Sequence, residues 1–283
     1  MLHEIDVEIR PNGFTFDDAL NMYQLHQNGN TFDQIAKIYN TDRHTIGRVL
    51  KRNGIVIDKR IYSCNEHYFD IIDTQDKAYI LGLFWSDGHN DTIRKKITIQ
   101  LQERDKEILE DINILIDSDR PLWLSPLHDQ NENWQNTYTL TIQSKHMSNI
   151  LENYGMVKRK SLVLEFPLCI NESLYRHFIR GYFDGDGCIS CNQNKNYLQM
   201  SMLGTPMVCG TISDICKKIG IKTFIYNNKN RNPMVCTFGI TNIKDRIKFF
   251  DWIYDDANLK LKRKYNKYQQ FINNNNINNS LAS

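Results

Sequence analysis

The chain has 283 residues, room for about two domains, and its 41% hydrophobic content excludes wholesale disorder. A formal net charge of +2 excludes a uniformly polycationic protein. No apolar run approaches the roughly 18 residues of a membrane span, and no secretion signal precedes the seven cysteines, so we expect an intracellular protein with no membrane partner.

Basic charge is concentrated in two segments. Residues 31–60 carry seven Lys or Arg against three Asp, and residues 257–270 carry five Lys or Arg and no acid. Local basic patches on a near-neutral protein indicate contact with nucleic acid, although two solvated faces are an equally good explanation.

Residues 1–62 predict a small all-α domain with three helices and a linker. The first helix spans Asp17–Gln27, Thr31 caps the second, and Thr41 or Asp42 caps a third that stops at Asn53-Gly54. Two helices joined by a short turn, the second one basic, are the helix-turn-helix pattern. The outer face of the third helix carries the residues that we expect to contact DNA in the major groove: Arg43, His44, Thr45, Arg48, Lys51 and Arg52.

This segment, with the string Thr-Ile-Gly-Arg-Val-Leu-Lys-Arg-Asn-Gly-Ile over residues 45–55, resembles the helix-turn-helix domain of resolvases and recombinases. The alternative is a generic helical hairpin with an exposed charged face.

The remainder predicts two halves with the same order of elements: a helix ending in Asp-Gly, two strands, a helix, two strands, a helix and a basic stretch. In the first half we expect a helix at Thr74–Ser86, a strand at Lys96–Gln102, a helix from Asp105 to about Ile116, strands around Leu122–Leu127 and Tyr138–Gln143, and a helix at Ser144–Asn153. In the second we expect a helix at Ser173–Gly185, strands near Cys188–Cys191 and Tyr197–Leu203, a helix at Pro206–Ile219 capped by Thr205, strands near Ile221–Tyr226 and Val235–Thr241, and a helix from about Ile243.

Two pairs of motifs set the register of this repeat. Asp186 follows Asp87 by 186 − 87 = 99 residues, and Lys262 follows Lys158 by 262 − 158 = 104. The offsets predict a duplicated unit of about a hundred residues, with repeats at 66–167 and 168–270 and a frayed Asn-rich tail at 271–283. The single Cys188-x-x-Cys191 lacks a second pair, so we expect ordinary strand cysteines rather than a zinc site.

Each leading helix carries small residues four positions apart: Gly82 with Ser86, and Gly181 with Gly185. Such residues share a helix face and permit close approach of a second backbone, which would bring Asp87 and Asp186 together at the helix ends. We expect the following glycines, Gly88 and Gly187, in the left-handed position that ends many helices. Two carboxylates at two negative helix ends favour a divalent cation, and hard oxygen ligands favour Mg²⁺.

The strings Ile80–Gly88 and Ile179–Gly187 resemble the LAGLIDADG motif, and two copies followed by Lys-Arg-Lys stretches are typical of monomeric two-repeat homing endonucleases. The resemblance implies an α+β fold with two pseudo-symmetric αββαββα repeats and saddle-shaped antiparallel sheets. It also implies site-specific, Mg²⁺-dependent double-strand cleavage of a long double-stranded DNA target in intron homing, in whatever cytoplasmic, organellar or viral-host compartment holds that DNA.

The resemblance assigns individual roles. Asp87 and Asp186 match the metal-binding acids. Lys262, with Lys158 or Lys160 in the first repeat, matches basic residues near the scissile phosphates. Gln102 matches a polar residue near the attacking water, and its counterpart at Leu203 or Gly204 breaks the pattern. The first motif also departs from the family pattern at Trp85, where the second keeps Asp184.

Outward positions on the predicted strands carry side chains suited to base edges. These are Lys96, Thr98, Gln100 and Gln102 on one strand and Thr139, Thr141 and Gln143 on another. Any half-buried antiparallel strand alternates in this way, so the pattern alone assigns no individual base contact.

Two other functions stay open. One is a DNA-binding transcription regulator that keeps the fold without cutting, which the two retained acids disfavour. The other is an RNA-binding maturase that assists intron splicing, which a helix-turn-helix suited to duplex DNA disfavours.

Overall fold

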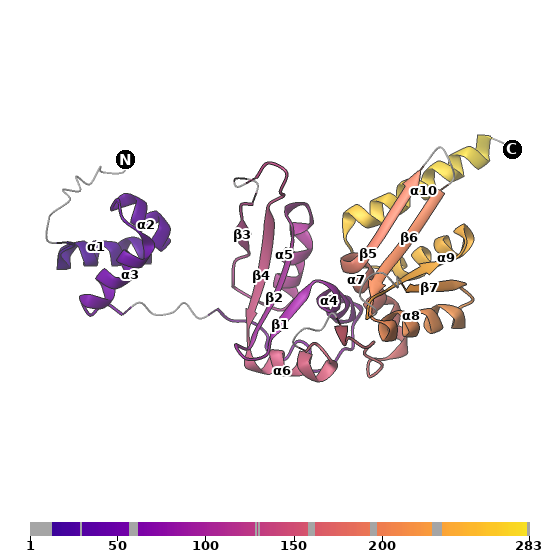
Figure 1. Cartoon of the computed structure of the whole chain (residues 1–283), viewed down its shortest axis with the longest axis horizontal. Helices are drawn as coiled ribbons and strands as arrows, with labels where there is room; N and C mark the ends of the chain where they lie inside the picture. Colours follow the sequence, from indigo (N-terminus) through magenta and orange to yellow (C-terminus); the bar gives the residue numbers. More distant parts are fainter. Residues whose placement is uncertain are drawn as a thin grey trace. The chain divides into compact units, whose positions relative to one another are not determined.

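The computed structural model describes residues 13–28, 30–56, 62–127, 129, 131–157, 162–192, 197–227 and 234–281, the last seven by their backbone alone. The chain divides into two compact units, residues 1–61 and 62–283 (Figure 1). Among the described helices, none combines the length and the apolar character that crossing a bilayer requires.

Unit 1 contains the three predicted helices in its described part: α1 (Phe16–Gln27), α2 (Phe32–Ile38) and α3 (Arg43–Arg52). Thr31 caps α2 in a reciprocal capping box with Gln34, and Asp42 caps α3 by accepting from the backbone of His44 and Thr45. The helices bury a small core of Ala19, Met22, Ile35, Ala36, Tyr39, Ile46, Val49 and Leu50. The three helices predicted for this segment are therefore present, and the helix-turn-helix assignment of the second and third stays a prediction.

Unit 2 contains the same sequence of elements twice, which confirms the predicted α+β fold. The first repeat has α4 (Gln75–Ser86), β1 (Gly88–Asp91), β2 (Lys96–Gln102), α5 (Lys106–Leu115), β3 (Trp123–Ser125), β4 (Thr137–Gln143) and α6 (Lys145–Tyr154). The second has α7 (Tyr175–Asp186), β5 (Gly187–Asn192), β6 (Tyr197–Gly204), α8 (Pro206–Lys218), β7 (Thr223–Asn227), β8 (Cys236–Ile240) and α9 (Ile243–Tyr254). A further helix, α10 (Lys262–Leu281), follows.

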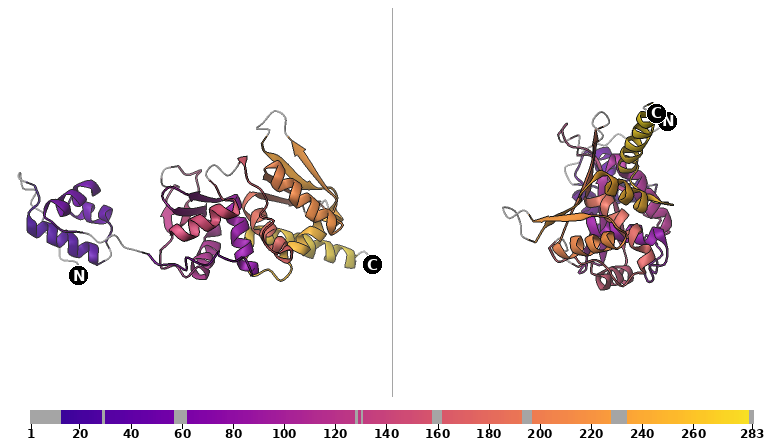
Figure 2. Two further views of the ribbon diagram at one scale, coloured as in Figure 1. Left: turned by 90° about the horizontal axis from the view of Figure 1, so that it is seen from below. Right: turned by 90° about the vertical axis from the view of Figure 1, so that its right-hand side faces the viewer.

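Each repeat forms a four-stranded antiparallel sheet, with the orders β1-β2-β4-β3 and β5-β6-β8-β7. Alternation along each strand sends one face to the helices: Ile97, Ile99 and Leu101 of β2 are buried, whereas Lys96, Thr98 and Gln100 lie on the opposite face. Helices α5 and α6 pack on the first sheet, and α8 and α9 pack on the second. The α4–α7 pair lies between the two repeats (Figures 1 and 2).

Glycines allow α4 and α7 to pack backbone against backbone. A Cβ atom built on Gly82 would lie 2.0 Å from the carbonyl oxygen of Phe178, and one on Gly181 would lie 2.0 Å from that of Tyr79. One on Gly185 would lie 1.8 Å from Oγ of Ser86. The predicted close approach through small residues is thus confirmed.

The prediction for the glycines after the aspartates is wrong. Gly187 has φ −85° and ψ 150°, and Gly88 is not among the residues with positive φ. Both begin a strand directly, so no left-handed turn is needed. They are instead sterically required, because a Cβ would lie 2.6 Å from the carbonyl oxygen of Phe84 at Gly88 and 2.3 Å from that of Phe183 at Gly187.

The Asn-rich C-terminal segment, predicted to fray, continues α10 as far as Leu281. Tyr268 and Phe271 of this helix are buried, and the Tyr268 ring packs 4.8 Å from that of Phe250 on α9. These two aromatic side chains pack the part of α10 that precedes the asparagine-rich run against the second repeat.

Gly181→Ala is expected to lower the free energy of unfolding by about 3 kcal/mol, because the added methyl must push two helix backbones apart. Gly210→Ala is the matched control: Gly210 lies within α8, a Cβ there meets nothing within 4 Å, and alanine should raise stability by up to about 1 kcal/mol. Urea unfolding of both variants measures the difference. Equal stability of the two would contradict the close-packed helix interface.

Candidate functional site

The two acidic residues of the repeated motif lie at the exposed ends of the paired helices. Asp87 is the C-cap of α4 and Asp186 is the last residue of α7. A Cβ built on Gly185 would lie 2.7 Å from Oδ2 of Asp87, so the Asp87 carboxylate lies against the residue that precedes Asp186. The backbone contact of the helices therefore brings the two carboxyl-bearing ends together, as the sequence predicts.

A buried lysine that the sequence interpretation passed over lies directly behind this pair. Nζ of Lys264 donates to the carbonyl oxygens at the end of α7 and the start of β5: Phe183 (2.7 Å), Asp184 (2.6 Å), Gly185 (3.2 Å) and Gly187 (2.5 Å). Its charge offsets the partial negative charge of the helix end.

Burial lowers the pKa of Lys264 to about 8, against the attraction of the Asp184 and Asp87 carboxylates, which raises it. Lys264 is the third residue of the second Lys-Arg-Lys stretch, so the motif contained the signal. Only the tertiary structure distinguishes it from Lys262, the residue that the resemblance favoured.

The other two residues of that stretch bind the first repeat. Lys262 is exposed and forms an ion pair with Glu107 of α5. Nε of Arg263 donates to both carboxylate oxygens of the buried Asp105, at 2.8 and 3.0 Å. The start of α10 therefore joins the two repeats. Lys158 and Lys160, the predicted counterparts in the first repeat, lie outside the described residues.

Gln102 ends β2, and its buried Oε1 accepts no hydrogen bond from the described part of the chain. Strand register identifies its counterpart. Gly88 pairs with Ile99 and Gly187 with Met202, so Gln102, three residues after Ile99, corresponds to Thr205 rather than to Leu203 or Gly204. The Thr205 hydroxyl donates to the Leu164 carbonyl (2.5 Å) and caps α8, so it has a structural partner already.

The faces of the two sheets turned away from the helices both carry polar and exposed aromatic side chains, in different numbers. On the first, Lys96, Thr98 and Gln100 lie beside the β4 residues Gln143, Thr141 and Thr139. Nε2 of Gln100 also donates to Oγ1 of Thr137 (2.6 Å). Exposed Trp123 of β3 lies on this same face, since it pairs with Thr139 of β4. The second face carries three exposed aromatic residues: Tyr197, Phe224 and Tyr226. The sequence interpretation did not single out these aromatic side chains, although their alternating positions were visible.

Asp184 and Trp85, which occupy the same position of the two motifs, have different hydrogen-bond partners. Asp184 is buried and accepts hydrogen bonds from the Tyr79 hydroxyl (2.8 Å) and the Leu261 backbone N–H (2.7 Å). Burial raises the pKa of Asp184, and the nearby Lys264 opposes this. Trp85 is buried and donates from Nε1 to the Glu165 carbonyl (2.9 Å), in the segment that connects the repeats.

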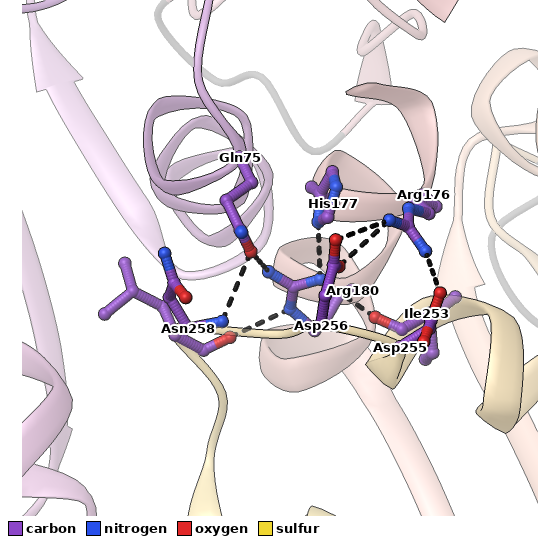
Figure 3. A network of polar contacts seen from close by, with 9 residues as sticks. Gln75, Arg176, His177, Arg180, Ile253, Asp255, Asp256 and Asn258 are labelled. Carbon is purple, nitrogen blue, oxygen red and sulfur yellow. Dashed lines mark hydrogen bonds and ion pairs between the residues drawn. The ribbon is translucent and has the colours of Figure 1, made fainter. Parts of the chain in front are cut away.

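A second buried network anchors α7 to the connection between α9 and α10 (Figure 3). The Arg180 guanidinium donates to the carbonyls of Leu259 (2.8 Å) and Ile253 (2.9 Å) and to Nδ1 of His177 (2.7 Å). Burial, together with the charge of Arg180, lowers the pKa of His177 to about 4. The ring is therefore neutral near pH 7 and can accept this hydrogen bond.

Salt bridges extend this network on its exposed side. Arg176, one turn before Arg180, pairs with Asp255 (3.0 Å) and Asp256 (2.9 Å) (Figure 3). Gln75 of α4 accepts from the backbone of Asn258 (3.2 Å), so the network also reaches the first repeat. Arg176 and Arg180 thus hold the earlier turns of α7 in place, and Asp186 is the last residue of the same helix.

In unit 1 the predicted DNA-contacting residues lie along the exposed side of α3, with Thr45 half-buried. Several have intramolecular partners: Arg43 pairs with Asp33 (3.6 Å), Arg48 donates to Oγ1 of Thr45 (2.9 Å), and Arg52 donates to the Phe14 carbonyl (2.7 Å). His44, Arg48 and Lys51 are exposed and share one face, because they are spaced four and three residues apart.

Lys264→Met is expected to reduce the free energy of unfolding by about 3–5 kcal/mol, because it leaves buried carbonyls at a helix end without a donor. Lys262→Met is the matched control two residues earlier, and loss of its exposed ion pair should cost less than about 1 kcal/mol. Chemical denaturation of both proteins tests this. A larger loss in Lys262→Met would overturn the assignment of the two lysines.

Comparison with known proteins finds a family match within the second repeat. The family model described as LAGLIDADG-like domain matches residues 173–254. An uncharacterized protein of Methanocaldococcus jannaschii, MJ0314, is 26% identical over 197 residues, which cover 65% of this chain and 71% of that protein.

Two longer proteins match over part of their length. The DNA-directed RNA polymerase subunit Rpo1C of M. jannaschii is 25% identical over 161 residues, covering 56% of this chain and 17% of its own. The ribonucleoside-diphosphate reductase NrdEB subunit alpha of Bacillus subtilis is 24% identical over 259 residues, covering 80% and 23%. The chain spans about a fifth of the length of these two relatives.

Solved structures with a similar arrangement include the I-LtrWI LAGLIDADG homing endonuclease bound to target DNA, with a TM-score of 0.48 and 15% identity, covering 73% of this chain and 89% of that one. Another is the meganuclease I-SmaMI bound to uncleavable DNA, with a TM-score of 0.48 and 13% identity, covering 72% and 91%. Residues 173–254, from the helix that carries Asp186 through the second sheet to α9, match the LAGLIDADG-like domain family.

Proposed function

We propose that this protein is a site-specific, divalent-metal-dependent DNA endonuclease of the LAGLIDADG homing type. The observation that carries the proposal is the meeting of Asp87 and Asp186 at the exposed ends of two helices in backbone contact. Each aspartate serves the cleavage of one strand, so that the paired repeats produce a double-strand cut.

The residues at the helix ends fit a Mg²⁺ ion. Asp87 and Asp186 are exposed and offer hard carboxylate oxygens, which leaves room for waters and phosphate oxygens as further ligands. We assign these two residues as the ones that would hold the metal. A bound divalent ion supplies a more acidic water and stabilises negative charge on the leaving oxygen.

The remaining polar groups around the aspartates receive supporting roles. Oε1 of Gln102, buried and without a partner in the described chain, can orient a water beside the phosphate. Lys264 keeps the end of α7 electrically balanced and so positions Asp186. We retain Lys262, Lys158 and Lys160 as candidates for contact with the scissile phosphates.

The DNA target would lie along the faces of the two sheets that the helices leave uncovered. Lys96, Thr98 and Gln100 offer donors and acceptors to base edges. Exposed Tyr197 and Tyr226 on the second sheet offer apolar contact. Because the two faces differ, the two halves of the target would differ in sequence.

Unit 1 would add contacts to flanking DNA through α3, with His44, Thr45, Arg43, Arg48, Lys51 and Arg52 as the candidate residues. We propose that the endonuclease acts as a monomer, since both repeats lie in one chain, and that it serves intron homing in the compartment that holds its target.

Asp87→Asn and Asp186→Asn are each expected to reduce double-strand cleavage by about 100-fold or more, because each removes a group that stabilises transition-state charge. The assay is cleavage of a plasmid library by purified protein in Mg²⁺ and in EDTA. Asp214→Asn is the control, since Asp214 lies on α8 and pairs with Lys217 at the surface.

Tight binding of a specific duplex with no Mg²⁺-dependent cut, even by the unaltered protein, would overturn the endonuclease proposal. It would instead support a DNA-binding regulator with this fold. Cleavage by both Asp→Asn variants at the rate of the Asp214→Asn control would refute the assignment of the aspartates alone.

Lys51→Ala is expected to weaken DNA binding about equally for all sequences and to reduce the slope of log K against log salt by about 1, because one phosphate contact is lost. Lys217→Ala, which removes the same charge from α8, should change neither quantity. Fluorescence anisotropy over a series of salt concentrations measures both slopes, and identical slopes would argue against DNA contact by this face of α3.

A further inference from the structure

A second cluster of metal-ligating side chains lies apart from the aspartate pair, in the first repeat. Asp70, in the turn before α4, accepts hydrogen bonds from two histidines through different carboxylate oxygens. His67 Nδ1 lies 2.7 Å from Oδ2, and His146 Nε2 lies 2.5 Å from Oδ1. The two imidazole rings lie 4.4 Å apart between centroids, so both face the same carboxylate.

The backbone on both sides of this cluster is held in place. Between His67 and Asp70, the Tyr68 and Phe69 side chains are buried, and the Asp70 N–H donates to the His67 carbonyl (3.1 Å). His146 is the second residue of α6, whose N-cap Ser144 donates from its hydroxyl to Glu66 (2.9 Å). The three side chains therefore meet because of fixed backbone geometry, not because of long flexible side chains.

The arrangement suits one dication better than two protonated rings. Two imidazolium ions at this separation would repel each other. Neutral rings can each offer a lone pair when the remaining hydrogen moves to the other ring nitrogen, and the carboxylate supplies negative charge. Two imidazole nitrogens and one carboxylate are a ligand set typical of zinc and related transition ions, whereas Mg²⁺ prefers oxygen ligands.

We propose that His67, Asp70 and His146 form a binding site for a zinc-type divalent transition ion, which fastens the segment before α4 to the start of α6. The three ligand atoms already lie within 4.8 Å of one another. Ligands of a tetrahedral zinc ion lie about 3.3 Å apart, given bonds of about 2.0 Å, so small side-chain rotations complete the site. The side chains are 72%, 36% and 39% exposed, which leaves the fourth position to water.

The test uses the full chain without an affinity tag, stripped of metal and titrated with zinc against a chromophoric chelator. One zinc ion should bind, with an affinity that falls by about 100-fold or more in His67→Ala, since loss of a group that merely supports a ligand costs about 10- to 100-fold. Zinc should also raise the melting temperature of the original protein and not that of His67→Ala. The exposed position of His67 makes it a replacement that the fold tolerates.

Two controls separate this site from others in the chain. His89→Ala removes an exposed histidine of β1, and Cys188→Ser removes an exposed cysteine of β5; neither should change zinc affinity. Excess Mg²⁺ should not displace the zinc, which separates this site from Asp87 and Asp186. An unchanged zinc affinity in His67→Ala, or no zinc binding by the original protein, would overturn the proposal, and neither result depends on whether the protein cuts DNA.

Discussion

The backbone contact between α4 and α7 is the constraint on which the arrangement of the repeats depends. Gly82 and Gly181 each approach a carbonyl oxygen of the opposite helix so closely that a Cβ would lie 2.0 Å from it. Dispersion between backbones falls steeply with distance, so any larger side chain would weaken the contact along the helix pair. Because both aspartates end these helices, the same glycines set the separation of the carboxylates. The glycines that allow the helices to pack therefore also position the two aspartates.

Bringing two helix ends and two carboxylates together has an electrostatic cost, and the chain offsets it unequally in its two halves. At the end of α7, the buried ammonium group of Lys264 donates hydrogen bonds directly to the last carbonyl oxygens of the helix. The buried Asp184 carboxylate accepts a hydrogen bond from the Leu261 N–H, just before α10. Its negative charge also lies close to the positive charge of Lys264. In the first half, Trp85 fills the corresponding motif position and bonds to the connecting segment. The two copies of the motif thus place their aspartates equivalently, at the ends of α4 and α7, but they differ in the buried residues that support those ends.

The asymmetry extends to the surfaces. The first sheet turns Lys96, Thr98, Gln100 and one exposed aromatic residue, Trp123, outward, whereas the second turns out three: Tyr197, Phe224 and Tyr226. Helix α10 also has no counterpart among the described elements of the first repeat, and its first residues bind Asp105 and Glu107 across the repeat boundary. A duplicated unit has therefore diverged into two halves that share a fold and a central contact while offering different chemistry to a partner.

Local signals in the chain are enough to predict the order of elements, the duplication and the convergence of Asp87 with Asp186. These signals are alternation along β2, the caps at Thr31 and Thr205, and glycines at helical spacing. Which lysine contacts the helix end could not be predicted in this way. Lys262 and Lys264 are the same residue type two positions apart, and their burial depends on distant partners. The contacts between strands also set the register by which Gln102 corresponds to Thr205, and the extended conformation of Gly187. Each of these depends on contacts between residues far apart in the chain, which local propensity does not encode.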